Sequence, residues 1–196
     1  MRIILLLSLI FVLPFSWKVR SLMDKEFQSH NSRKSNYCPR VDLEILEMNL
    51  PPSLEVYFAI RKYSSEYEIP LKYALGVAYA ETRYEGPFHW KYNQVQESYA
   101  GALGPMQVMP GTAKGLLRKV LERTEEADNL TPQRLAEDID LNVELSMCLL
   151  RRLYDKHGDW KLVFGAYNTG KPCVNGYAQM VYHYVPKIDL YEIPIN

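Results

Sequence analysis

The segment 74–82 constrains the fold of this chain more strongly than any other stretch. It is rich in small and apolar residues, and Gly86-Pro87 follow it as a stop signal. A helical period predicts that Glu81 ends the buried stripe, which consists of Leu71, Ala74, Leu75 and Ala78. A carboxylate on a buried face is costly unless it is paired, neutral or used. We therefore expect Glu81 to have a function. Burial and the negative end of the helix dipole should both raise the pKa of its carboxyl.

Helical periodicity and strong end signals continue through the rest of the chain. We expect helices over 51–67, from Pro70 through Glu81, after Pro110, after the Thr131-Pro132 cap, and from about 140, 160 and 175 onward. Residues 122–129 are interpreted as a charged connection and residues 88–99 as an aromatic-rich loop. The best strand candidate, 41–45, is short. The pattern predicts an all-α fold with one domain over residues 51–196.

The N-terminus indicates export. A basic residue precedes the run 3–15, which is apolar apart from Ser8 and Pro14. A membrane-spanning helix needs about 20 such residues, so the run is more typical of a signal peptide. We assign residues 1–21 to a signal peptide or a short uncleaved anchor, and residues 22–50 to a linker and N-terminal extension. The expected location is the periplasm or cell envelope.

Charge and cysteine usage exclude some functions. The chain has 23 basic and 23 acidic residues, so it has no overall field that would attract nucleic acid, and we expect no nucleic-acid partner. Neither a phosphate-binding loop nor a zinc-ligand spacing occurs, so we expect no cofactor and no metal. Cys148 fits a buried free thiol, which leaves Cys38 and Cys173 as the better candidates for a disulfide bridge.

Four stretches in order resemble the lytic transglycosylase family, which has a goose-type-lysozyme-like fold. The family's Glu-Ser pair at a helix end is similar to Glu81-Thr82. Its Gly-Leu-Met-Gln signature and the helix start after it are similar to 104–107 (Gly-Pro-Met-Gln) and 110–113 (Pro-Gly-Thr-Ala). Its Ala-Tyr-Asn-x-Gly and Tyr-Val-Pro-Lys motifs match 166–170 and 184–187, and Asn142-Val143 resembles the Asn-Ile that opens its long helix. The resemblance covers about residues 56–188.

The resemblance implies a single lysozyme-like helical domain with a glycan-binding groove. It implies cleavage of the β-1,4 bond between N-acetylmuramic acid and N-acetylglucosamine in peptidoglycan, with Glu81 as the only acid and base. The sugar's own 6-hydroxyl would attack the anomeric carbon, which gives a 1,6-anhydro end. The implied partner is the peptidoglycan glycan strand, met by a monomer. Compact members of the family often accompany envelope-spanning machinery, which makes such machinery a second partner by analogy.

The resemblance also implies a substrate-binding set beside Glu81: Thr82, Met106, Gln107, Tyr167, Asn168 and Tyr184. Each of these except Gln107 also has a plainer explanation. Met106 and Tyr184 suit core packing, Thr82 and Asn168 suit helix ends, and the ring of Tyr167 continues an apolar stripe. The resemblance implies that the hydroxyl of Tyr167 points toward Glu81 or the sugar. Trp90 and Tyr92 are candidates for stacking on outer sugars.

The chain also departs from the family pattern. Thr82 replaces serine, Pro105 replaces leucine and lacks an N–H donor, Ser146 stands where glycine is common, and Met180 stands where many members have glutamate. Two other functions therefore stay open. One is a goose-type-like lysozyme that hydrolyses the same bond with a second carboxylate, for which Glu85 and Glu97 are the candidates. The other is a catalytically silent peptidoglycan-binding module.

Overall fold

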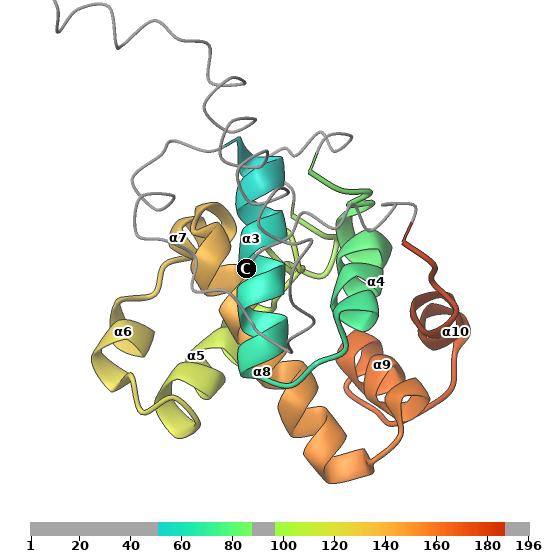
Figure 1. Ribbon diagram of the computed structural model, residues 1–196. Coiled ribbons are helices and arrows are strands. Elements are labelled where there is room, and N and C mark those ends of the chain that lie inside the picture. Colours follow the sequence, from blue (N-terminus) through green and yellow to red (C-terminus); the bar gives the residue numbers. More distant parts are fainter. Residues whose placement is uncertain (1–50, 88–96, 187–196) are drawn as a thin grey trace, which may run out of the picture. The chain divides into compact units, whose positions relative to one another are not determined.

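The computed structural model describes residues 51–87 and 97–186, all within one compact unit, Leu43–Ile188. The described part is helical and contains isolated bridges but no named strand. Its helices, labelled in Figure 1, are α3 Pro52–Glu66, α4 Leu71–Thr82, α5 Pro110–Lys119, α6 Thr124–Asn129, α7 Pro132–Glu137, α8 Ile139–His157, α9 Trp160–Thr169 and α10 Gly176–Tyr182. The expected all-α fold class is confirmed for these residues.

The helix ends follow the sequence signals closely. The Thr131 hydroxyl accepts a hydrogen bond from the N–H of Arg134, and the Asp159 carboxylate caps α9 through the N–H of Lys161. Gly170 ends α9 in the left-handed conformation. One expectation was wrong: the charged segment 122–129 is not only a connection, because Thr124–Asn129 forms the short helix α6. Acidic residues in its first turn face the positive end of the helix dipole, which favours that helix.

Helix α4 is enclosed rather than buried along a single stripe. Every residue from Tyr73 to Ala78 is buried, whereas Leu71 is only partly buried. The helix packs against α3 on one side and α10 on another. A Cβ atom at Gly76 would lie 3.1 Å from the carbonyl oxygen of Val181, so the missing side chain permits this close approach of α10. The predicted one-sided stripe is therefore wrong, because two helices cover α4.

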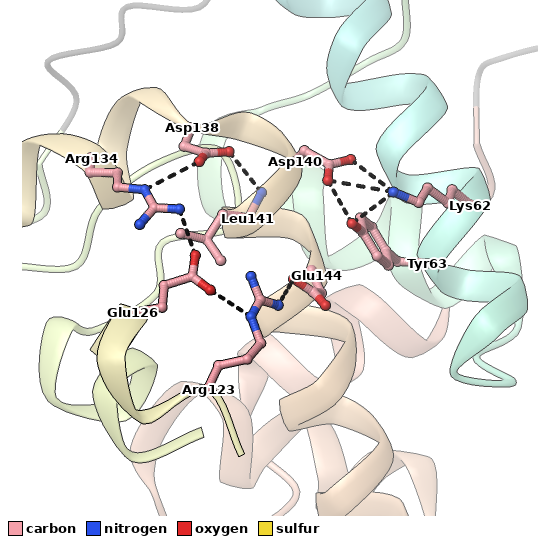
Figure 2. Close-up of polar contacts among 9 residues, drawn as sticks. All are labelled: Lys62, Tyr63, Arg123, Glu126, Arg134, Asp138, Asp140, Leu141 and Glu144. Carbon is pink, nitrogen blue, oxygen red and sulfur yellow. Dashed lines mark hydrogen bonds and ion pairs between the residues drawn. The ribbon is translucent and has the colours of Figure 1, made fainter. Parts of the chain in front are cut away.

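Ion pairs join α6, α7 and α8 (Figure 2). Nε of Arg123 lies 2.5 Å from Glu126 on α6, and Nη1 lies 2.7 Å from Glu144 on α8. Arg134 on α7 contacts Glu126 at 2.5 Å and Asp138 at 3.5 Å. Isolated surface pairs contribute little, but a connected network holds several elements in one arrangement. This network fixes the first half of α8 to the short helices.

A second polar cluster joins α8 to α3 (Figure 2). The hydroxyl of Tyr63 donates to Asp140 at 2.6 Å, and Nζ of Lys62 lies 3.4 Å from the same carboxylate. Burial first, and then the hydrogen bond to Asp140, raises the pKa of Tyr63, so its hydroxyl remains a donor. The first turns of α8 are thus held from both sides. They carry Asn142, which is central to the site described below.

Several expectations fall outside the described residues: the signal segment, the linker 22–50, the strand candidate 41–45, Trp90, Tyr92 and Cys38. Cys148 is a buried free thiol, as expected. Cys173 also has a free thiol, and Cys38, its expected bridge partner, lies outside the described residues. Within residues 51–87 and 97–186, no helix is long and apolar enough to span a membrane.

The close packing of α9 on the loop after it gives a stability prediction. A Cβ atom at Gly165 would lie 1.7 Å from the carbonyl oxygen of Cys173, so Gly165→Ala must displace the loop. We expect this variant to lower the free energy of unfolding by roughly 2 kcal/mol or more. The matched control is Gly115→Ala on α5, where a Cβ meets nothing within 4 Å. Because alanine favours helix, the control should gain up to about 1 kcal/mol. Urea unfolding measures both, and equal midpoints would contradict the packing described here.

Candidate functional site

Glu81 lies in the last turn of α4 and is partly buried. The hydroxyl of Tyr177 on α10 donates a hydrogen bond of 2.6 Å to its Oε1 atom. Burial raises the pKa of Glu81 to about 7, and the hydrogen bond from Tyr177 acts in the opposite direction. A carboxyl with this pKa is protonated in a large fraction of molecules near neutral pH. It can therefore both give and accept a proton there.

Tyr177 is a dependable donor to this carboxyl. Burial first, and then the charge of Glu81, raises the pKa of Tyr177 well above its ordinary value. The phenol therefore keeps its proton at any pH at which the protein works. Asn175 caps α10 by accepting from the N–H of Ala178, which fixes the helix start just before Tyr177.

The end of α4 turns sharply after Glu81. Arg83 adopts φ 57° and ψ 35°, the left-handed conformation that glycine usually supplies. A residue with a Cβ atom is destabilised there by roughly 1 kcal/mol. The residue between them, Thr82, is buried, and its hydroxyl lies 2.9 Å from the carbonyl oxygen of Pro105 and 3.3 Å from that of Ala78. Thr82 thus ties the end of α4 to the turn 104–107.

The turn 104–107 is a hydrogen-bonded β-turn. The N–H of Gln107 donates to the carbonyl oxygen of Gly104 at 3.1 Å, and Leu103 and Val108 pair on either side. Pro105 occupies the second position, where its fixed φ is favourable and no N–H is needed. Its replacement of leucine therefore fits the turn. Gly104 has φ +76°, and a Cβ atom there would lie 2.3 Å from Nδ2 of Asn142.

Asn142 on α8 holds this turn from beneath. Its side chain has no exposed surface, and it makes three hydrogen bonds. Oδ1 accepts from the N–H of Met106 at 3.0 Å. Nδ2 donates to the carbonyl oxygens of Leu103 at 2.9 Å and Leu135 at 3.0 Å. One buried amide therefore fixes the turn to α8 and to the end of α7.

Tyr167 on α9 holds the same turn from a third helix. Its hydroxyl lies 2.7 Å from the carbonyl oxygen of Met106 and 2.9 Å from the hydroxyl of Ser146. A carbonyl only accepts, so the single phenolic proton is used there, and Ser146 must donate to Tyr167. We expected the Tyr167 hydroxyl to face Glu81 or the sugar; the hydrogen bond to Glu81 is made by Tyr177 instead. Tyr167 still lies close enough to Glu81 to feel its charge. Burial first, and then the charge of Glu81, raises the pKa of Tyr167.

The remaining predicted site residues have different surroundings. The side chain of Met106 is fully buried, so it belongs to the core, and only its backbone takes part in the turn. Gln107 is partly buried with φ 50°, and its Nε2 atom donates to the carbonyl oxygen of Gly104 at 2.9 Å. Asn168 is exposed and accepts from Asn175 at 3.2 Å, which joins α9 to the start of α10. Tyr184 is partly buried, with its ring stacked on another ring, described below.

Sequence reasoning missed Tyr177 and gave no role to Ser146. Tyr177 is 96 positions from Glu81, and no motif or spacing connects the two. Ser146 stood out only as a departure from a family pattern. Its hydroxyl acts through Tyr167, which a single sequence does not reveal.

The described residues offer little for a metal or a charged cofactor. They contain no group of three or more histidine, cysteine or acidic side chains placed to hold a metal ion. A depression of about 740 Å³ lies at α6 and is lined by Glu122, Arg123, Thr124, Glu125, Glu126, Asn129 and Arg134. Three of its charged side chains, Arg123, Glu126 and Arg134, already pair with one another in the ion-pair network. Glu81 is therefore the best centre for a chemical reaction.

Burial raises the pKa of Glu81 and the hydrogen bond from Tyr177 lowers it, so removing that bond should change the pKa measurably. Tyr177→Phe removes the donor but keeps the ring, so the pKa of Glu81 should rise above its value of about 7. Tyr167→Phe is the control, because the hydroxyl of Tyr167 donates to Met106 and not to Glu81. Carboxyl carbon shifts of labelled glutamate, followed by NMR against pH, measure both variants. A larger rise in Tyr167→Phe than in Tyr177→Phe would contradict the assignment.

The raised pKa also predicts how stability depends on pH. The Glu81 carboxyl has a pKa of about 7 when folded and an ordinary value of 4.5. The folded state binds more protons between these values, so the free energy of unfolding falls as pH rises through that range. Glu81→Gln removes this loss. Its stability relative to wild type should grow by on the order of 3 kcal/mol between pH 4.5 and 8, measured by urea unfolding. A difference that does not change with pH would refute the raised pKa.

One comparison with known proteins identifies a family. The model of the Transglycosylase SLT domain matches residues 58–188, which include Glu81, the turn 104–107, Asn142 and Tyr167. No curated protein and no solved structure gave a match. The match covers well over half of the chain. The chain therefore belongs to the Transglycosylase SLT domain family and has its lysozyme-like, all-α fold.

Proposed function

We propose that the protein is a peptidoglycan lytic transglycosylase in which Glu81 is the single acid and base. Family membership supports peptidoglycan as the substrate. The observation that carries the proposal is the partly buried Glu81 carboxyl, with a pKa of about 7 and a 2.6 Å hydrogen bond from Tyr177. An acid of this strength suits a reaction in which one group must first donate and then accept a proton near neutral pH.

In the proposed reaction, protonated Glu81 gives its proton to the oxygen between N-acetylmuramic acid and N-acetylglucosamine. The bond from that oxygen to the anomeric carbon of N-acetylmuramic acid breaks, and the N-acetyl group of the same sugar stabilises the cation-like state. Glu81, now a carboxylate, accepts the proton of the 6-hydroxyl as that oxygen bonds to the anomeric carbon. The product is a 1,6-anhydro sugar, no water is consumed, and Glu81 is protonated again.

Tyr177 suits both halves of this cycle. Its hydrogen bond favours the carboxylate form, which is the form present after the first proton transfer. Burial favours the neutral form, which is needed before it. The balance keeps the two forms of Glu81 close in free energy near neutral pH.

Gln107, at the end of the fixed turn 104–107, is the proposed polar contact to the sugar, together with Asn168 and Tyr184. Thr82 and Tyr167 are proposed to act by holding that turn.

The surroundings of Glu81 favour this mechanism over hydrolysis with a second carboxylate. Glycosidase carboxylates lie about 5–9.5 Å apart, and a charge within about 4–6 Å shifts the pKa of a carboxyl. The pKa of Glu81 responds to burial and to Tyr177, with no contribution from Glu85 or Glu97. Glu97 is exposed, whereas the charge of Glu85 acts on Tyr184. This supports the substrate's own hydroxyl as the nucleophile.

We further propose that residues 51–196 form the catalytic domain and that residues 22–50 link it to a signal peptide or anchor over residues 1–21. The apolar run near the N-terminus supports export to the periplasm or cell envelope. A monomer would suffice for the reaction, because Glu81, Tyr177 and the turn come from one chain. Envelope-spanning machinery is proposed as a partner only by analogy.

Product analysis tests the proposal. Residues 22–196 incubated with purified peptidoglycan should release 1,6-anhydromuropeptides, and mass spectrometry distinguishes these from hydrolysis products, which are one water heavier. Activity should decline as pH rises above about 7, because Glu81 must be protonated first.

Glu81→Gln should lower the rate by at least ~10³-fold, since it removes both proton transfers. Reducing-end products alone would identify a hydrolase. Full activity in Glu81→Gln, or glycan binding without turnover in wild type, would reject both enzyme functions.

A further inference from the structure

Arg83 is an exposed cation two residues after Glu81. Its guanidinium carbon lies 5.2 Å from the centre of the Tyr79 ring, and Nη1 lies 3.8 Å from Sδ of Met180. The Tyr79 ring is itself stacked on Tyr184, with centroids 4.8 Å apart. These contacts orient the guanidinium without neutralising it, because a ring face and a thioether are weak partners for a cation.

Most other arginines in the described part are used differently. Arg118, Arg123, Arg134 and Arg151 each pair with at least one carboxylate. Within residues 51–87 and 97–186, Arg83 has no carboxylate partner. It is therefore an oriented guanidinium that retains its capacity for a planar, two-point contact with a carboxylate.

Helix α10 places this guanidinium near the reactive carboxyl. Tyr177 contacts Glu81, and Met180 contacts Arg83. Residues three apart on a helix share a face and are about one turn apart. The Arg83 head group therefore lies about one helical turn from the Glu81–Tyr177 hydrogen bond, measured along α10.

The backbone at Arg83 is left-handed, as it also is at Glu68, Gln107 and Glu122. The position has φ 57°, where glycine would be less strained. The residue is exposed, so its contacts with Tyr79 and Met180 leave much of the side chain open to solvent.

We propose that Arg83 binds a carboxylate of the peptide attached to the glycan strand, beside the bond that Glu81 cleaves. The inference rests on the proposed function, since peptidoglycan carries acidic peptides on the lactyl group of N-acetylmuramic acid. The peptide branches from the sugar whose anomeric carbon reacts. A cation close to Glu81 is thus placed to meet it. Arg83 then makes the enzyme prefer strands that still carry acidic peptides.

Matched substrates test this preference. Two glycan oligomers of equal length are compared, one with free peptide carboxylates and one with the same carboxylates amidated. Wild-type protein should show about a tenfold higher kcat/KM on the free carboxylates, mainly through KM. Arg83→Gln should remove that preference, so that its kcat/KM values on the two oligomers become equal. Arg83→Lys should keep part of it, because the charge remains but the two-point geometry is lost.

Two further variants separate function from folding. Arg83→Gly should lose the preference while its Tm stays the same or rises, because glycine is unstrained there. Met180→Glu should also lose it, because the new carboxylate would occupy Arg83 within the protein. The control is Arg152→Gln, which removes an exposed arginine of α8 and should change nothing.

Binding to the inactive protein keeps this inference separate from the proposed function. Calorimetry on Glu81→Gln should show about tenfold tighter binding of the free-carboxylate oligomer, and the double variant with Arg83→Gln should bind both oligomers equally. Equal binding of the two oligomers by Glu81→Gln overturns the role of Arg83, as does an equal loss on both oligomers in Arg83→Gln. Wild-type protein that binds with this preference but does not turn over would instead refute the proposed function alone.

Discussion

The site depends on the backbone of two residues, Pro105 and Met106. Three helices hold this backbone through three different atoms: Thr82 of α4 donates to the carbonyl oxygen of Pro105, Tyr167 of α9 donates to that of Met106, and Asn142 of α8 accepts from the N–H of Met106. These helices are far apart in sequence but meet at two consecutive peptide groups. A turn held in this way is more rigid than a surface loop usually is. Its rigidity fixes the backbone of Gln107, the last residue of a turn that Thr82 ties to the end of α4.

The carbonyl of Met106 also gives different roles to the two tyrosines near Glu81. Tyr167 uses its single proton on the turn, so it acts as part of the framework. Tyr177 uses its proton on the carboxyl, so it acts on the strength of the acid. Two chemically identical side chains therefore have distinct tasks, and the carbonyl of Met106 decides which task each has. The hydroxyl of Ser146 completes this assignment by supplying the proton that Tyr167 accepts.

Much of the fold could be predicted from the sequence, because its helices have strong local end signals. Pro132 after Thr131, Asp159 and Gly170 mark boundaries that depend on neighbouring residues alone. Helix α6 could not be predicted as easily, because Arg123 and Arg134 stabilise it through pairs with Glu126 from outside the helix. In the site, Glu81 was predictable as a charge on an apolar helix. Tyr177 was not, because its partner is defined only by how α10 packs across Gly76.

The residues at positions 104 and 142 constrain each other. Any side chain at Gly104 would overlap the amide of Asn142, since even a Cβ atom would lie 2.3 Å from Nδ2. A smaller residue at 142 would make room, but the N–H of Met106 would then lose its acceptor. Neither position can therefore change first without loss of the turn. During divergence of this protein, the two sites must vary together or remain fixed, even though 38 positions separate them.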